Sequence, residues 1–189
     1  KYRKKKILIT GVSGFKGSWL SLILANFFNS EVIGVDRIHV NKNRAHYELI
    51  KNSKNIKFIK LDLKNFNQVK KIFESYSFDY IFHFAADALV SECFKKPKES
   101  WSNNLLGSLN LLESIRIFST KSVLNISTTD KVYYNENIDK KFIENDKIWG
   151  LETYGASKVA TELLIDNYFS SYLKEKKIHI NIFRGGNVI

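Results

Sequence analysis

The sequence predicts the α/β fold class, with a doubly wound parallel sheet covered by helices on both faces, and three observations support this. Short apolar runs alternate along the chain with longer segments whose apolar residues recur at helical spacing. The apolar runs are nearly continuous, as expected for strands that are buried on both faces. A glycine-rich turn, G-V-S-G-F-K-G, joins the first run to the first helical segment, which is typical of the Rossmann fold.

Six strands are expected, each an apolar run closed by a turn-forming or polar residue. In chain order the runs read I-L-I-T, V-I-G-V-D, I-K-F-I-K-L, Y-I-F-H-F, S-V-L-N-I and I-H-I-N-I-F. Apolar residues three or four positions apart predict the helices between them. The expected strands span 7–10, 32–36, 56–61, 80–84, 122–126 and 178–183, and the expected helices span 15–28, 66–76, 97–118 and 154–173.

The composition is that of an ordinary globular protein, with 44% hydrophobic and 26% charged residues among 189. No apolar run approaches the roughly 20 residues of a membrane-spanning helix, so we expect no membrane partner. Cys93 is the single cysteine, which excludes an intrachain disulfide and gives no basis for a metal site. A reducing cytoplasm is therefore the expected location.

The formal net charge of +11 raises the question of a nucleic-acid partner. The lysines, however, are spread along the whole chain, and the one compact cluster, K-Y-R-K-K-K, precedes the first strand. A basic surface of this kind suits an anionic small substrate at least as well. We therefore expect no nucleic acid among the partners.

The glycine-rich turn has the properties of a pyrophosphate-binding turn. Gly11 permits a tight turn, Gly14 lets backbone N–H groups approach a phosphate, and Gly17 lets the helix pack closely on the strand. Asp36 ends the second strand, where an acid can bind both ribose hydroxyls of NAD. Arg37 follows it and can instead face a 2′-phosphate, which leaves NADP open. A glycine-rich turn with a capping acid is the alternative interpretation.

Two further segments point to chemistry at the carboxyl ends of the later strands. The stretch S-T-T-D-K-V-Y places Thr129, Asp130 and Lys131 just after the fifth strand. Tyr154 and Lys158 are four positions apart at the start of a helix, so they lie on one helix face. In a doubly wound sheet both segments converge beside the same ligand. Each motif alone is common by chance, and their conjunction is much more specific.

These motifs resemble the extended short-chain dehydrogenase/reductase superfamily, which contains the NAD-dependent nucleotide-sugar epimerases and dehydratases. The resemblance is carried by G-V-S-G-F-K-G, F-H-F-A-A, N-N-L-L-G-S-L-N-L-L-E, T-T-D-K-V-Y, Y-G-A-S-K and R-G-G-N-V-I, in the family's order. Within it, G-F-K-G-S-W-L, the T-D-K triplet, E-N-D and G-N-V-I most resemble the CDP-glucose 4,6-dehydratase branch. The resemblance covers residues 1–189 as an NAD-binding Rossmann domain.

The resemblance implies a role for each matched residue. The cofactor, NAD with NADP not excluded, is expected to contact Gly11, Gly14, Phe15, Lys16, Gly17, Asp36, Arg37, Asp62, Leu63, Ala85, Ala86, Asn104, Tyr154 and Lys158. Asp62 would lie near the adenine, although a helix N-cap is an equally good interpretation of it. Thr129 would hydrogen-bond the sugar O4, and Asn187 would approach the diphosphate of the nucleotide-sugar substrate.

The implied catalytic residues are Thr129, Asp130, Lys131, Tyr154 and Lys158. Tyr154 would take the O4 proton, and its pKa, about 10 for a free phenol, would be lowered by Lys158 and the nicotinamide ring. Asp130 and Lys131 would supply the acid and the base for water loss across C5 and C6. A lysine acts as a base only when neutral, so we expect Lys131 to be buried.

Two departures from the family pattern leave the sugar and the nucleotide base open. The family's dehydratases usually carry a glutamine and an arginine where this chain has Asp87 and Ser91. A 4-epimerase of the same family is one alternative, because it needs only Thr129, Tyr154 and Lys158. An inverting UDP-N-acetylglucosamine dehydratase ranks lower, since its tyrosine follows a shorter loop. A non-catalytic NAD(P)-binding sensor or scaffold is the alternative from another class.

The resemblance also implies features beyond this domain. Relatives continue past the last strand into a smaller substrate lobe, so the chain looks truncated, and that lobe is expected to be absent. Relatives commonly form homodimers through two long helices, here the segments 97–118 and 154–173, which would make a four-helix interface.

Overall fold

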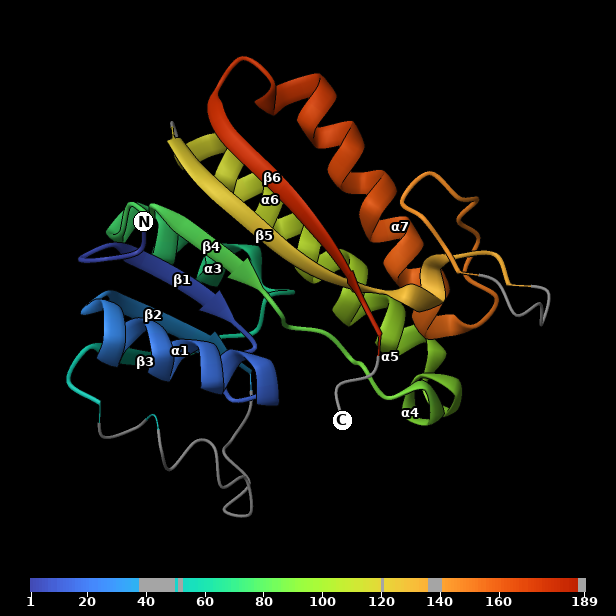
Figure 1. Ribbon diagram of the computed structural model, residues 1–189, viewed down its shortest axis with the longest axis horizontal. Coiled ribbons are helices and arrows are strands. Elements are labelled where there is room, and N and C mark those ends of the chain that lie inside the picture. Colours follow the sequence, from blue (N-terminus) through green and yellow to red (C-terminus); the bar gives the residue numbers. More distant parts are fainter. Residues whose placement is uncertain (38–49, 51–52, 120, 136–140, 187–189) are drawn as a thin grey trace.

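The computed structural model describes residues 1–37, 50, 53–119, 121–135 and 141–186. It contains a six-stranded parallel sheet in the order β3-β2-β1-β4-β5-β6 (Figure 1), which confirms the predicted doubly wound fold. The order reverses between β1 and β4, so a ligand crevice is expected at the carboxyl ends of these two strands. The strands are β1 Lys6–Thr10, β2 Glu31–Asp36, β3 Ile56–Lys60, β4 Tyr80–His83, β5 Lys121–Thr129 and β6 Lys177–Gly185.

Helices cover the sheet in two layers, because alternate strand residues point to opposite faces. Leu8 belongs to a buried cluster with the apolar residues of α3, α6 and α7. Its neighbours Ile7 and Ile9 instead pack in a second cluster with Leu24 of α1. The long helices are α1 Phe15–Phe28, α3 Phe66–Ser75, α6 Gly107–Phe118 and α7 Thr153–Tyr168.

The structure divides the two longest predicted helices. The segment 97–118 contains α5, a π-helical turn and then α6, and α7 likewise ends in a π-helical turn. A short helix, α4, was missed because its six residues are too few to show helical periodicity. The added elements are α4 Val90–Lys95, α5 Pro97–Trp101 and the π-helical turns Ser102–Leu106 and Phe169–Leu173.

Strands β5 and β6 are longer than predicted, and this matters for the site. They pair in parallel from Lys121–Lys177 to Thr129–Gly185. The polar residues S-T-T at the end of β5 resemble a loop in sequence, but their backbone groups pair with β6. The sheet therefore extends to Thr129 and fixes its position, and Asp130–Val132 follows as a single 3-10 turn.

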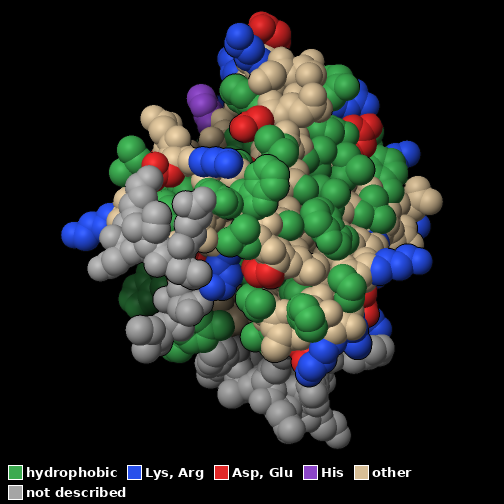
Figure 2. All heavy atoms as spheres, turned by 90° about the vertical axis from the view of Figure 1, so that its right-hand side faces the viewer, with side chains coloured by type: hydrophobic (Ala, Val, Ile, Leu, Met, Phe, Trp, Pro, Cys, Tyr) green, Lys and Arg blue, Asp and Glu red, His purple; other side chains and the backbone are tan. Residues whose placement is uncertain are grey.

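A broad apolar area lies on the side of the molecule that carries α7 (Figure 2). Large apolar side chains on α5, α6, α7 and the two π-helical turns are exposed, and a monomeric protein rarely exposes a large contiguous apolar patch. They are Trp101, Leu106, Ile117, Leu163, Phe169 and Tyr172. Among the residues that the structure describes, no helix is long and apolar enough to cross a membrane.

Candidate active site

The glycine-rich turn between β1 and α1 packs too tightly for larger residues. Gly11 has φ +70°, and a Cβ there would lie 2.7 Å from the backbone nitrogen of Ala85. A Cβ at Gly17 would lie 2.3 Å from the Gly11 carbonyl oxygen. Gly14 is the N-cap of α1 and provides no side-chain acceptor, so the first backbone N–H groups of the helix face the crevice. The turn therefore fits a pyrophosphate.

Asp36 and Arg37 lie beside this turn but make different contacts. The Asp36 carboxylate accepts hydrogen bonds from the backbone N–H of Ser13, at 3.2 Å, and from the Ser13 hydroxyl. These contacts hold the acid at the edge of the glycine turn, where an adenosine ribose would lie. The Arg37 guanidinium instead donates to Asp87 at 2.6 Å. The carboxylate, the glycine turn and the helix end together fit a dinucleotide.

The N-cap interpretation of Asp62 is wrong, because Asn65 caps α3 by accepting from the Gln68 N–H. The Asp62 carboxylate accepts from the backbone N–H of Lys64 at 2.9 Å, within the turn that follows β3. Leu63 lies in the same turn, and its carbonyl accepts from the Asn110 side chain of α6 at 2.8 Å. The turn is thus anchored to α6 while Asp62 stays partly exposed.

Asn104 is a buried connection between the end of β4 and α7. Its side-chain oxygen accepts from the Asp87 N–H at 2.7 Å, and its side-chain nitrogen donates to the Ser157 hydroxyl at 2.9 Å. Only 1% of Asn104 is exposed, and the residue lies in the π-helical turn 102–106. The segment that contains Ala85 and Ala86 is thereby fixed relative to the helix that carries Tyr154.

His83 lies beneath the crevice and is buried, with one hydroxyl group in hydrogen-bonding contact with each of its ring nitrogens. Its Nδ1 is 2.7 Å from the Thr10 hydroxyl and its Nε2 is 2.9 Å from the Ser108 hydroxyl. Since Ser108 donates its own proton to the Asn104 carbonyl, it accepts from Nε2–H, and Thr10 donates to Nδ1. Burial, with a smaller effect of Lys158, lowers the His83 pKa from 6.5 to about 3. The imidazole is therefore neutral and structural.

This burial predicts a specific loss of stability in acid. Because the folded pKa of His83 is about 3, the unfolded chain binds the extra proton first as the pH falls below 6.5. At pH 5 relative to pH 7.5, His83 should lower the free energy of unfolding by about 2 kcal/mol. Urea unfolding at the two pH values measures it. His83→Gln should remove this part of the decline in unfolding free energy, whereas the change at an exposed histidine, His179→Gln, should not. Equal declines in the wild type and both variants would contradict the assignment of the effect to His83.

The predicted catalytic residues from two distant segments lie together. Thr129 ends β5, and its hydroxyl lies near the Tyr154 phenol at the start of α7, where the two groups interact. The Thr129 hydroxyl also donates to the Asp130 carboxylate at 3.1 Å. Tyr154, Thr129 and Asp130 therefore lie side by side, and Lys131 follows Asp130 in the same 3-10 turn.

Two contacts that sequence reasoning missed hold Tyr154 against this turn. Glu152 caps α7 by accepting from the backbone N–H groups of Tyr154, at 2.6 Å, and Gly155, at 2.7 Å. A Cβ at Gly155 would lie 2.6 Å from the Lys131 carbonyl oxygen, so the helix and the turn touch through their backbones. An acid immediately before the helix was the available signal for the cap.

Gly155→Ala should therefore disturb the site and the fold together. The added methyl group meets the Lys131 carbonyl and must displace backbone, which we expect to cost about 1–3 kcal/mol of unfolding free energy. Gly186→Ala is a matched control, since its Cβ would meet Asp130 Oδ2 at an ordinary 3.4 Å. Urea denaturation compares the two variants. Equal free energies of unfolding would show that the start of α7 can shift without loss of stability.

The buried lysine of the site is Lys158, not Lys131. Lys158 is 3% exposed and donates to the Ser127 carbonyl at 3.3 Å, whereas Lys131 is exposed. Burial and the nearby Lys16 ammonium lower the pKa of Lys158 to about 8. The expectation of a buried Lys131 is thus wrong for the chain as described. Burial also raises the pKa of Tyr154, which is opposite to the lowering expected from the sequence.

Sequence reasoning also missed a hydrogen-bonded network around Glu162 that supports the site. Glu162, 2% exposed, accepts from the Arg184 guanidinium at 2.7 Å and from the Thr128 hydroxyl at 2.7 Å. The same guanidinium donates to the Tyr133 hydroxyl and to the Glu144 carbonyl. This pairing raises the pKa of Arg184. The network joins β5, β6, α7 and the segment before α7 that contains Glu144, and its only sequence signal was an acid four residues after Lys158.

Some features lie outside this group. Asn187 falls outside the described residues, so its predicted role stays a prediction. Within the described ranges, no cluster of three or more His, Cys, Asp or Glu residues could hold a metal ion.

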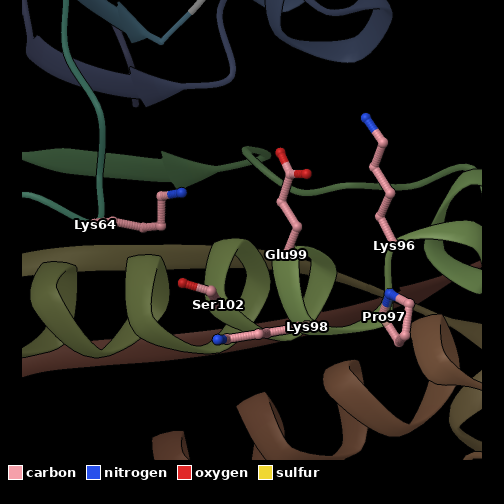
Figure 3. Close-up of a pocket in the computed structure, with 6 residues that line it drawn as sticks. All are labelled: Lys64, Lys96, Pro97, Lys98, Glu99 and Ser102. Atoms are coloured by element: carbon pink, nitrogen blue, oxygen red, sulfur yellow. The ribbon is translucent and has the colours of Figure 1, made fainter.

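One pocket, of about 460 Å³, contains none of the predicted site residues and is left outside the candidate site (Figure 3). It is lined by Lys64, Lys96, Pro97, Lys98, Glu99 and Ser102.

Comparison with known proteins identifies relatives of the whole described domain. The sequence model of the family described as GDP-mannose 4,6 dehydratase matches residues 8–184. A CDP-glucose 4,6-dehydratase of Salmonella typhimurium is 27% identical over 100% of this chain and 53% of its own length. A dTDP-D-glucose 4,6-dehydratase of Dictyostelium discoideum is 31% identical over 97% and 44%, respectively. The chain thus spans about half the length of the curated relatives it matches.

Solved structures agree with this grouping. Pal from Bacillus thuringiensis superposes with a TM-score of 0.82 at 28% identity, covering 95% of this chain and 55% of that one. The UDP-glucose 4-epimerase of Thermotoga maritima, solved with UDP-glucose, gives 0.80 at 27% identity, covering 95% and 54%. A UDP-glucuronic acid 4-epimerase from Bacillus cereus, in complex with NAD, gives 0.80 at 25%, covering 95% and 55%. The chain therefore belongs to the GDP-mannose 4,6 dehydratase family, among the nucleotide-sugar epimerases and dehydratases of the extended short-chain dehydrogenase/reductases.

Proposed function

We propose that the intact gene product containing this chain is a nucleotide-sugar 4,6-dehydratase, with CDP-glucose as the best candidate substrate. It would convert an NDP-hexose into the NDP-4-keto-6-deoxyhexose. One observation carries the proposal: Thr129 ends β5, Asp130 and Lys131 follow it in a single 3-10 turn, and that turn contacts the helix bearing Tyr154 and Lys158. Similarity to named CDP-glucose and dTDP-D-glucose 4,6-dehydratases supports the assignment.

NAD is the proposed cofactor, since the turn at Gly11, the carboxylate of Asp36 and the buried Lys158 fit a dinucleotide and its nicotinamide ribose. The bound cofactor would accept a hydride from C4 and return it to C6. Its positive ring would also favour the phenolate of Tyr154, which burial alone disfavours. We expect Tyr154 to become a base only when the cofactor is bound.

The proton transfers of the proposed reaction balance among Tyr154, Asp130 and Lys131. Tyr154 takes the O4 proton, Lys131 removes the C5 proton, and Asp130 protonates the C6 hydroxyl as it leaves as water. Lys131 then returns its proton to C5. Tyr154 is left with one proton too many and Asp130 with one too few. The neighbouring groups Tyr154, Thr129 and Asp130 offer a path for the proton that restores both.

A 4-epimerase of the same family is the second candidate, and the similarity to solved 4-epimerases favours it. Epimerisation requires Thr129, Tyr154 and Lys158 but no acid and base for water loss. Asp130 and Lys131 would then be structural. The two reactions have different products, so one assay separates them.

The test is to incubate the intact gene product with CDP-glucose, and in parallel with dTDP-, UDP- and GDP-hexoses. A 4-keto-6-deoxy product absorbs in alkali, whereas an epimerised hexose does not and is identified by chromatography. Product from CDP-glucose alone would support the proposal as stated. Epimerised sugar would establish the alternative, and binding of NAD with no turnover of any nucleotide sugar would favour a sensor or scaffold.

We also propose a cytoplasmic homodimer formed through α6, α7 and their π-helical turns, with neither nucleic acid nor membrane as partner. The exposed apolar area of Figure 2 supports this interface, since a patch of this kind is unusual on a monomer. Leu163 lies 60% exposed on α7. Leu163→Lys should shift the sedimenting species from dimer to monomer, while Lys177→Ala, at the start of β6, should not.

A further inference from the structure

An ion pair spans the crevice in which the adenosine part of a dinucleotide would lie. Arg37 follows β2 and Asp87 follows β4, and in the sheet these strands flank β1 on either side. The guanidinium and the carboxylate are 2.6 Å apart. Their contact therefore joins the two sides of the glycine-rich turn at the end of β1. The pair lies between residues 50 positions apart in sequence, so no local pattern could indicate it.

Asp87 is rigidly oriented for this contact. Its second carboxylate oxygen accepts from the Asn103 side chain at 2.6 Å. Its backbone N–H donates to Asn104 at 2.7 Å, and its carbonyl accepts from the Asn104 side chain at 3.2 Å. The Asp87 side chain is 22% exposed and that of Arg37 is 41% exposed. These contacts fix the position of the Asp87 carboxylate, which in turn holds the more exposed Arg37 side chain.

Arg37 stands at the position where an arginine can accommodate the 2′-phosphate of NADP. The charge that would attract this phosphate is neutralised by Asp87. A phosphate there would also meet two carboxylates, Asp36 and Asp87, on opposite sides of the turn. Specificity commonly depends on such a repulsive element as well as on attraction for the preferred ligand.

We propose that Asp87 is a cofactor-specificity residue that withholds Arg37 from the 2′ position and restricts the site to dinucleotides with a free 2′-hydroxyl. The proposal rests on the proposed function, in that it assumes a dinucleotide at this turn. It also gives a role to a residue that departs from the family's usual glutamine. A neutral amide at position 87 would leave Arg37 free to meet a phosphate.

The experiment is a fluorescence titration of NADH and NADPH into the intact gene product and its variants. Asp87→Asn should tighten NADPH binding by about tenfold while NADH affinity stays within about twofold. Asp87→Asn combined with Arg37→Gln should lose this gain, because the effect acts through the arginine. Asp79→Asn is the matched control, since it breaks the partly exposed Lys5–Asp79 pair, 2.8 Å long, at the opposite end of the sheet. Thermal melts confirm that each variant is folded.

The outcomes separate the two proposals. An NADPH:NADH affinity ratio that Asp87→Asn leaves unchanged or lowers would overturn the specificity role while leaving the dehydratase proposal intact. The expected change in the ratio, together with no turnover of nucleotide sugars, would support the specificity role and count against the dehydratase. Binding of neither cofactor by the wild-type protein would overturn both.

Discussion

Lys131→Ala should leave oxidation at C4 measurable and abolish water loss. In the proposed reaction, Lys131 removes the C5 proton only after C4 has been oxidised, so its loss stops the second step and not the first. Removing a general base costs about 10²–10⁴-fold in rate. We therefore expect the variant to form reduced cofactor, seen as nicotinamide absorbance on mixing with substrate, and to form the 4-keto-6-deoxy product at least about 100-fold more slowly than wild type.

Two companion variants make this result specific. Tyr154→Phe should lose both signals, since the phenol is proposed to take the O4 proton before any other step. Lys177→Ala, an exposed lysine at the far end of β6, should lose neither. A wild-type rate of dehydration in Lys131→Ala would mean that the lysine is structural and that another group removes the C5 proton.

The exposure of Lys131 gives this prediction a physical condition. In the described chain the Lys131 side chain is exposed to solvent. A bound nucleotide sugar over the turn would desolvate it. We accordingly expect modification of Lys131 by an amine reagent to be blocked by substrate, whereas modification of Lys177 should be unaffected.

Glu162→Gln should cause the largest loss of stability. The change removes the carboxylate that pairs with the Arg184 guanidinium. The Arg184 side chain is 19% exposed and that of Glu162 is 2% exposed, so a charge is left unpaired in a largely buried site. Breaking one partner of a buried ion pair typically costs about 3–5 kcal/mol. For a domain of this size we expect a fall in melting temperature of roughly 6–20 °C.

Glu74→Gln is the control for this measurement. Glu74 pairs with Lys70 on the surface of α3 at 3.5 Å, and both side chains are more than two-fifths exposed. Such pairs contribute at most about 1 kcal/mol. The double variant Glu162→Gln with Arg184→Gln should be more stable than the sum of the single changes predicts, because it leaves no unpaired charge. Equal melting temperatures for the wild type and Glu162→Gln would show that the network carries little stability.

The sequence determined the order of the elements and therefore the fold. Its apolar runs and helical spacings are local properties, and they predicted six parallel strands in the doubly wound order that the structure contains. The sequence also singled out Tyr154 and the T-D-K stretch as neighbours, because residues at the carboxyl ends of parallel strands meet at one edge of the sheet. When the topology is known, the relative positions of short motifs can therefore be predicted from the sequence alone.

Only the tertiary structure decided which charged groups are buried and which are paired. The Glu162–Arg184 network and the Arg37–Asp87 pair join residues 22 and 50 positions apart, and no periodic pattern records such contacts. Burial falls on Lys158 and not on Lys131, because α7 packs its inner face against β5 while Lys131 lies on the solvent side of the 3-10 turn. Desolvation and ion pairing depend on distance in space, whereas the sequence fixes only distance along the chain.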